Sequence, residues 1–273
     1  MRDILVHVRN FENCTPALRY GSQLAAQFGA SLAGLYAFPS PDYVAPAYEP
    51  ELMAAILENT RELERQALSA KASVLRWMTE NGAGKAEWLV AEGNAADVLT
   101  QAASRFDALV LEHPGDEHRD SPSDLPELVL KSGVPCIVLP RAITPSGPIE
   151  RVAVAWNGSA EAMRAVHAAI PFLRGKSVIL LVGPEQETYQ RVFWKTPFRI
   201  REYLDSHDVD VWPRVINVHD EDAGAELLKH AMEFKADLLV MGAYGHSRFS
   251  EWMLGGATRH VLAHAHLPVL LRH

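Results

Sequence analysis

The feature that most constrains the fold is an alternation of short apolar runs with amphipathic segments, which occurs twice along the 273 residues. Short apolar runs predict buried parallel strands, and segments whose apolar residues recur every three to four positions predict helices. The chain is therefore expected to form parallel sheets with right-handed crossovers and helices on both faces. The predicted strands are 4–8, 31–37, 87–91, 108–111 and 134–139, then 152–156, 177–182, 211–215, 238–241 and 269–271.

The predicted helices lie between these strands. Thr15 is a candidate N-cap for a helix that begins at Pro16, and Gly29 is a stop signal at its other end. The helices are 16–28, 51–80, 95–105 and about 127–132, then 160–173, a partly helical 185–208, 224–234 and 259–265.

The two series of elements form an internal repeat. The segment 98–102 (Val-Leu-Thr-Gln-Ala) is similar to 227–231 (Leu-Leu-Lys-His-Ala), and each leads to an aspartate, Asp107 or Asp237, before an apolar strand. The segment 140–150 contains three prolines and a glycine, which is typical of a linker. We therefore predict two α/β domains, residues 1–140 and 151–273, each with a five-stranded parallel sheet.

The strand 238–241 is followed by a pattern that suits a phosphate group. Gly242 and Gly245 come directly after it, and the pair Gly255-Gly256 precedes a predicted helix. Glycines allow close backbone approach, and a helix start offers free N–H groups with a partial positive charge. Ligands of such sheets bind beyond the carboxyl ends of the strands, where the strand order reverses. We expect the nucleotide phosphates here.

Composition excludes several classes of partner. The net charge of −8, from 26 basic and 34 acidic residues, argues against nucleic acid. The two cysteines form no disulfide framework, and no apolar run reaches the roughly 18 to 20 residues of a membrane span. The chain enters its first strand without a signal-peptide segment. We expect a cytoplasmic protein without membrane association.

Two stretches of the second half resemble the universal stress protein (UspA) domain: Ala155-Trp156-Asn157-Gly158-Ser159, and Gly242-x2-Gly245-x9-Gly255. The first half resembles a diverged copy of the same domain. The resemblance implies a tandem pair of adenine-nucleotide-hydrolase-like (Rossmann-like) domains. In this family the last strands of paired domains associate, which implies an intramolecular pseudo-dimer and allows a further homodimer.

The resemblance also implies a ligand, ATP with or without Mg²⁺, or another adenine nucleotide. Asn157 stands where the family has an aspartate near adenine and ribose, and Gly256 where binding members have Ser or Thr. Thr258 retains a hydroxyl group, so that the missing bond would cost on the order of 1–2 kcal/mol without abolishing binding. The implied site comprises Ala155, Trp156, Asn157, Gly158, Ser159, Met241, Gly242, Gly245, His246, Arg248, Gly255, Gly256, Ala257 and Thr258.

The first half lacks this pattern. After its fourth predicted strand come Glu112, His113 and Pro114, which place an acid and a residue without an N–H where a phosphate would sit. We expect no nucleotide in this half and a role in packing or dimerisation.

The expected function is a stress-response module that binds a nucleotide and signals, without catalysis beyond slow ATP hydrolysis, because no nucleophile–base pair is evident. The alternative is an interaction protein in which both sites are degenerate. A weaker third is an ATP-pyrophosphatase-type enzyme, for which the turn at 156–160 is too short and too poor in glycine. His260 and His264 have the i, i+4 spacing of metal ligands, but no carboxylate or thiolate of matching spacing accompanies them, so no metal is expected.

Overall fold

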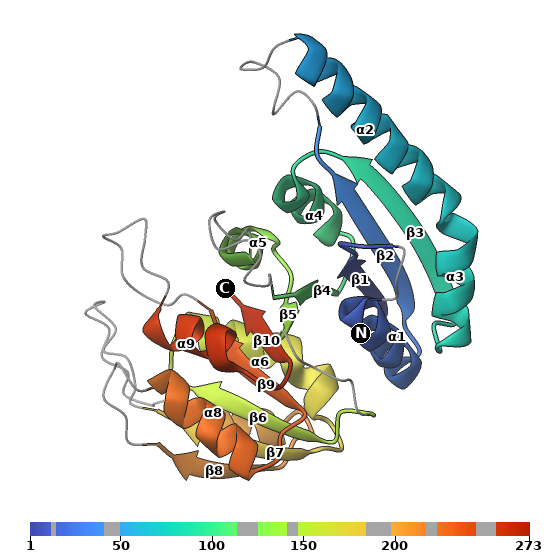
Figure 1. The fold of residues 1–273 in the computed structure, drawn as a ribbon. Helices are drawn as coiled ribbons and strands as arrows, with labels where there is room; N and C mark the ends of the chain where they lie inside the picture. Colours follow the sequence, from blue (N-terminus) through green and yellow to red (C-terminus); the bar gives the residue numbers. More distant parts are fainter. Residues whose placement is uncertain are drawn as a thin grey trace. The chain divides into compact units, whose positions relative to one another are not determined.

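A computed structural model describes residues 1–11, 15–40, 50–113, 125–140, 147–183, 198–216, 223–243 and 255–273. The chain divides into two compact units, Met1–Pro148 and Ile149–His273 (Figure 1). Each unit is built from its own parallel sheet and its own helices.

The sheet of the first unit has the strand order β3-β2-β1-β4-β5, and neighbouring strands are parallel. Its central strands consist almost entirely of buried apolar residues, as the continuous apolar runs predict. The strands are β1 (Asp3–His7), β2 (Ser31–Phe38), β3 (Lys85–Glu92), β4 (Ala108–Glu112) and β5 (Cys136–Leu139).

The helices of the first unit begin close to the predicted positions, with one difference. The predicted helix 51–80 is divided at Ala70, where the hydroxyl groups of Ser69 and Ser73 donate to the carbonyls of Gln66 and Ala70. The same two carbonyls still accept the backbone N–H groups of Ala70 and Val74, so the hydroxyl groups add to the helical bonds, an arrangement typical of bent helices. The helices are α1 (Pro16–Phe28), α2 (Pro50–Ser69), α3 (Lys71–Glu80), α4 (Ala95–Ala103) and α5 (Leu125–Lys131).

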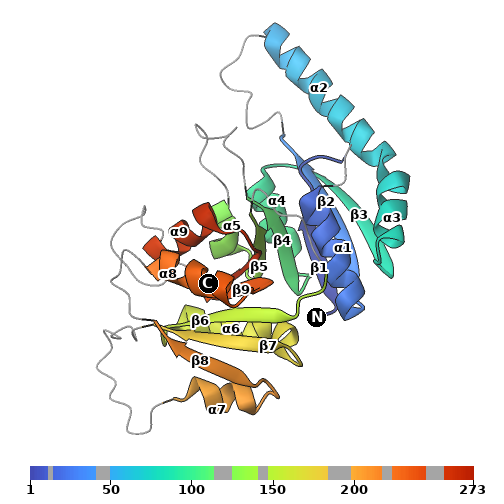
Figure 2. The ribbon, with the colours of Figure 1, turned by 60° about the horizontal axis from the view of Figure 1, so that its bottom comes forward.

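The second unit repeats this topology, with the order β8-β7-β6-β9-β10. Its strands are β6 (Arg151–Trp156), β7 (Ser177–Val182), β8 (Val211–Val215), β9 (Leu238–Gly242) and β10 (Val269–Arg272). Its helices are α6 (Ala160–Leu173), α7 (Ile200–Asp205), α8 (Ala223–Glu233) and α9 (Gly256–His264). Figures 1 and 2 show α6 on one face of this sheet and α8 and α9 on the other.

An aspartate clamp confirms that the repeat is structural. Asp237 Oδ2 accepts the backbone N–H groups of Glu150 at 2.9 Å and Arg151 at 2.8 Å. In the first unit Asp107 Oδ2 accepts those of Arg2 and Asp3 in the same way. The clamp fixes the fourth strand beside the first in each unit, which is where the strand order reverses. Crevices at such reversals bind ligands.

None of the helices that the structure describes has the length and apolar character needed to cross a membrane.

Candidate functional site

The turn after β6 is held by its own side chains. Gly158 has a φ of 75°, a left-handed conformation that favours glycine. Asn157 Oδ1 accepts the N–H of Ser159 at 3.2 Å, and Ser159 Oγ accepts the N–H of Ala162 at 3.1 Å. Ser159 is therefore the N-cap of α6. The predicted site residues 157–159 thus shape the turn and start the helix, whatever else they contact.

Gly242, the last residue of β9, is in direct contact with the first turn of α6. A Cβ atom at this position would lie 2.5 Å from the nitrogen of Ala162 and 2.6 Å from the carbonyl carbon of Glu161. These distances are too short for any side chain, and the opposing atoms are backbone. Glycine at 242 is therefore required so that α6 can start against the end of β9. The sequence predicts Gly242 in a phosphate-binding loop, and the structure shows that it has this packing role.

Trp156 is buried in an aromatic group. Its ring centroid lies 6.1 Å from that of Phe198, which in turn lies 6.0 Å from that of Tyr203 on α7. Trp156 follows Val154 by two residues, so both side chains lie on the same side of the sheet. Its ring is in contact with protein, and it links β6 to the segment that leads into α7.

Two further predicted site residues lie at the ends of β9 and β6 and are buried to different degrees. Met241 is 5% exposed, and Ala155 in β6 is half-buried. Both residues lie in strands of the parallel sheet, Ala155 in β6 and Met241 in β9.

The start of α9 is the anion-suited element of the second unit. Gly255 is its N-cap and provides no side-chain hydrogen bond, and the first turn contains no acidic residue. Outside the chain neighbours and the backbone of α9 itself, no heavy atom of the described residues lies within 4 Å of a Cβ atom placed on Gly256, whereas Thr258 is buried. The N–H groups of Gly256, Ala257 and Thr258 belong to the first turn, which carries a partial positive charge.

Three predicted site residues, Gly245, His246 and Arg248, lie outside the described residues. The structure thus brings together the turn 157–159, the start of α6 and Gly242. Residues 255–258 form the start of the helix that follows β9 in the chain.

The first unit has acids at the equivalent places. Glu112, the last residue of β4, accepts the N–H of Ala17 in the first turn of α1, with 2.8 Å between Oε1 and nitrogen. Helix α5 has Glu127 in its first turn. A carboxylate at a helix N-terminus takes up the N–H groups and the partial positive charge that would otherwise attract a bound anion. That this half binds no nucleotide stays a prediction.

The histidine pair of α9 makes contacts of its own. The rings of His260 and His264 stack with centroids 4.3 Å apart, and His264 Nδ1 lies 2.9 Å from the carbonyl oxygen of His260. In the described part of the chain, no group of three or more His, Cys, Asp or Glu side chains is arranged to hold a metal ion.

Sequence reasoning missed one residue at this site, Glu161. It lies in the first turn of α6 beside Gly242, and its side chain is 12% exposed. The signal that would have found it is the repeat: the first unit has Glu112 and Ala17 where the second has Gly242 and Glu161. The carboxylate is therefore on the fourth strand in the first unit and on the first helix in the second.

Comparison with known proteins agrees with this architecture. The sequence profile of the universal stress protein family matches residues 1–120 and 148–273. A universal stress protein from Synechocystis sp. is 26% identical over 198 residues, which are 65% of this chain and 62% of that protein. The chain thus matches less than two thirds of the length of this relative.

Two solved structures show the same fold over nearly the whole chain. One is a universal stress protein from Archaeoglobus fulgidus, with a TM-score of 0.71 and 15% identity, covering 99% of this chain and 95% of that one. The other is a protein of unknown function from Pseudomonas aeruginosa, with a TM-score of 0.60 and 12% identity, covering 100% and 92%. The predicted fold class is confirmed.

Proposed function

Because the chain belongs to the universal stress protein family, we propose that its C-terminal half binds an adenine nucleotide, ATP, and acts as a binding and signalling module. The observation that carries the proposal is the start of α9, a glycine-capped helix N-terminus without an acid in its first turn. It follows β9, whose end lies against α6 at the reversal of strand order. This combination supports an anionic ligand beyond the carboxyl ends of the strands.

The residues fit the parts of a nucleotide. The N–H groups at the start of α9 and the Thr258 hydroxyl group would hold phosphate oxygens, and Gly256 leaves open space for them. Asn157 retains an acceptor for the nucleoside end, although its Oδ1 already accepts from Ser159. Mg²⁺, when bound with the nucleotide, would neutralise phosphate charge. The role proposed is binding rather than catalysis, because the Ser159 hydroxyl group caps α6 and no partner base contacts it among the described residues.

The direct test is an acid placed at the start of α9. Gly256→Asp is expected to leave the fold intact, because a Cβ at 256 meets no neighbour among the described residues and an acid stabilises a helix N-terminus. The same charge repels phosphate, so we expect ATP affinity in calorimetric titration to fall by about tenfold or more. Gly256→Asn is the matched neutral control and is expected to bind much more tightly than the aspartate variant. Equal affinity of the two variants would contradict the proposal.

The second candidate, an interaction protein without a nucleotide, is favoured by one observation: the turn 157–159 uses its polar atoms internally. It predicts no heat of ATP binding for the wild-type chain in the same titration.

A further inference from the structure

One carboxylate oxygen at the site is buried without a partner. Glu161 Oε1 accepts from Arg164 on the next turn of α6, at 3.3 Å from the guanidinium Nη1. Glu161 Oε2 is buried and has no hydrogen-bond partner in the described part of the chain. Buried polar groups are almost always hydrogen-bonded, and a buried carboxylate oxygen is costly to leave unpaired. The exception calls for a donor that the described part of the chain does not supply.

The place of Glu161 indicates where that donor would come from. Glu161 is the second residue of α6 and lies against Gly242 at the end of β9, at the reversal of strand order between β6 and β9. Ligands of open α/β sheets bind at this place. The residue that carries the unpaired oxygen therefore lies at the end of the second sheet where such ligands bind.

In the first unit, the contact between the end of the fourth strand and the start of the first helix includes a hydrogen bond from within the protein. There the N–H of Ala17 is taken by the carboxylate of Glu112. In the second unit the equivalent N–H is that of Glu161 itself, and Gly242 has no side chain with which to reach it. Glu161 thus combines a first-turn backbone N–H with a carboxylate acceptor, and Gly242 has no side chain that could accept from this N–H.

A hydroxyl group suits this pair better than a cation does. A hydroxyl group can donate to Oε2 and accept from an N–H at the same time. A divalent cation needs several oxygen ligands, and no cluster of three or more His, Cys, Asp or Glu side chains is found where the structure is described. Arg164 already neutralises part of the carboxylate charge.

Resting on the proposed function, we propose that Glu161 recognises a ribose hydroxyl group of the bound nucleotide and thereby selects ribonucleotides over deoxyribonucleotides. The residue sets specificity: the ribose hydroxyl group donates to the unpaired Oε2. A nucleotide without this hydroxyl group leaves the buried oxygen unpaired and binds more weakly.

The test compares ATP with 2′-deoxyATP and 3′-deoxyATP by calorimetric titration in the presence of Mg²⁺. For the full wild-type chain, we expect at least one deoxy analogue to bind about 10- to 100-fold more weakly than ATP, as for the loss of a hydrogen bond to a charged group. Glu161→Ala is expected to bring this ratio close to one. Glu161→Gln keeps the side-chain size, so it guards against a folding defect, and is expected to reduce the ratio to a few-fold.

The matched control is Glu202→Ala, which removes an exposed first-turn glutamate of α7 that pairs with Arg199. It is expected to leave the ratio unchanged. The inference is overturned if ATP and both deoxy analogues bind the wild type equally, or if the ratio survives in Glu161→Ala. If the wild type does not bind ATP at all, the proposed function itself is overturned. If it binds ATP but does not discriminate the deoxy analogues, only the role of Glu161 is overturned.

Discussion

Glu112 and Gly242 occupy the same position in the two units, at the end of the fourth strand, and contact the first helix in opposite ways. Glu112 reaches α1 with its carboxylate, 2.8 Å from the nitrogen of Ala17. Gly242 lies so close to α6 that a Cβ would be 2.5 Å from the nitrogen of Ala162. In the first unit a carboxylate from the fourth strand contacts the start of the first helix. In the second unit the strand backbone packs directly against the helix backbone, and Glu161 lies beside this contact. This difference separates the two halves chemically.

Gly242→Ala is predicted to destabilise the second unit by about 1–3 kcal/mol, the usual cost of forcing atoms into a packed place. The neighbours are backbone atoms of α6, which cannot rotate away as a side chain can. Urea denaturation measures the effect. Gly256→Ala is the matched control, because a Cβ there meets nothing within 4 Å. A loss of stability no greater than that of the control would show that α6 moves aside freely.

Gly256→Ser is predicted to tighten ATP binding by up to about tenfold, since it adds a hydroxyl donor at the first residue of α9 in open space. Gly256→Ala adds the same carbon without the hydroxyl group and serves as the control in the titration. Weaker binding by the serine variant than by the alanine variant would place the phosphates elsewhere.

Stability is predicted to rise with pH between about 4 and 6.5 because of His7. Burial, with the nearby charge of Arg9, lowers the pKa of His7 from 6.5 to about 4. Between these values the unfolded chain binds a proton that the folded chain does not, so acidification favours unfolding, by roughly 3 kcal/mol in total. Urea denaturation at pH 7.5 and pH 5 measures the change. His7→Gln should show a smaller loss on acidification, and an equal loss would assign the effect to other groups.

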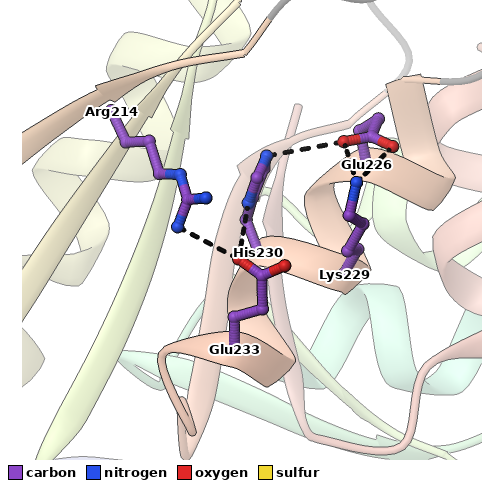
Figure 3. Close-up of polar contacts among 5 residues, drawn as sticks. All are labelled: Arg214, Glu226, Lys229, His230 and Glu233. Carbon is purple, nitrogen blue, oxygen red and sulfur yellow. Dashed lines mark hydrogen bonds and ion pairs between the residues drawn. The ribbon is translucent and has the colours of Figure 1, made fainter.

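A second pH effect is predicted at α8, where His230 lies between two carboxylates (Figure 3). Its Nδ1 is 3.2 Å from Glu233 Oε2 and its Nε2 is 3.4 Å from Glu226 Oε2, while Arg214 pairs with Glu233. The hydrogen bond with His230, and then the charges of Arg214, His230 and Lys229, lower the pKa of Glu233 below 4.5.

A lowered pKa of a glutamate stabilises the folded chain above the ordinary pKa, and the contribution is lost as the pH falls through the folded value. Glu233→Gln should therefore lower Tm at pH 7, and its difference from wild type should shrink below pH 4.5. Thermal scans monitored by circular dichroism across this range provide the measurement. A difference that does not depend on pH would mean that the carboxylate charge of Glu233 contributes nothing.

The strands and their order in the repeat could be predicted because they depend on local patterns. The apolar run 238–241 is buried as a strand, and Thr15 and Gly29 bound α1 as the capping rules predict. The break at Ala70 could not be predicted, because neither a glycine nor a proline marks it in the sequence.

The site was harder to predict because its contacts join distant segments. Ser159 and Gly242 are a serine and a glycine, and these residue types suit a ligand-binding loop and a closely packed helix start equally well. Only the distance between β9 and α6 shows the packing role of Gly242. Glu161 looks like an ordinary first-turn acid in the sequence, and only its burial and its unpaired oxygen set it apart.

The most direct test of the account is the number of nucleotides that one chain binds, counted by native mass spectrometry of the full chain with Mg²⁺ and ATP. The account predicts one ATP per chain in the wild type and strongly reduced occupancy in Gly256→Asp. The reason is that α9 has no acid in its first turn whereas α5 has Glu127, and that β9 ends in Gly242 whereas β4 ends in Glu112. Two nucleotides per chain, or none, would contradict it.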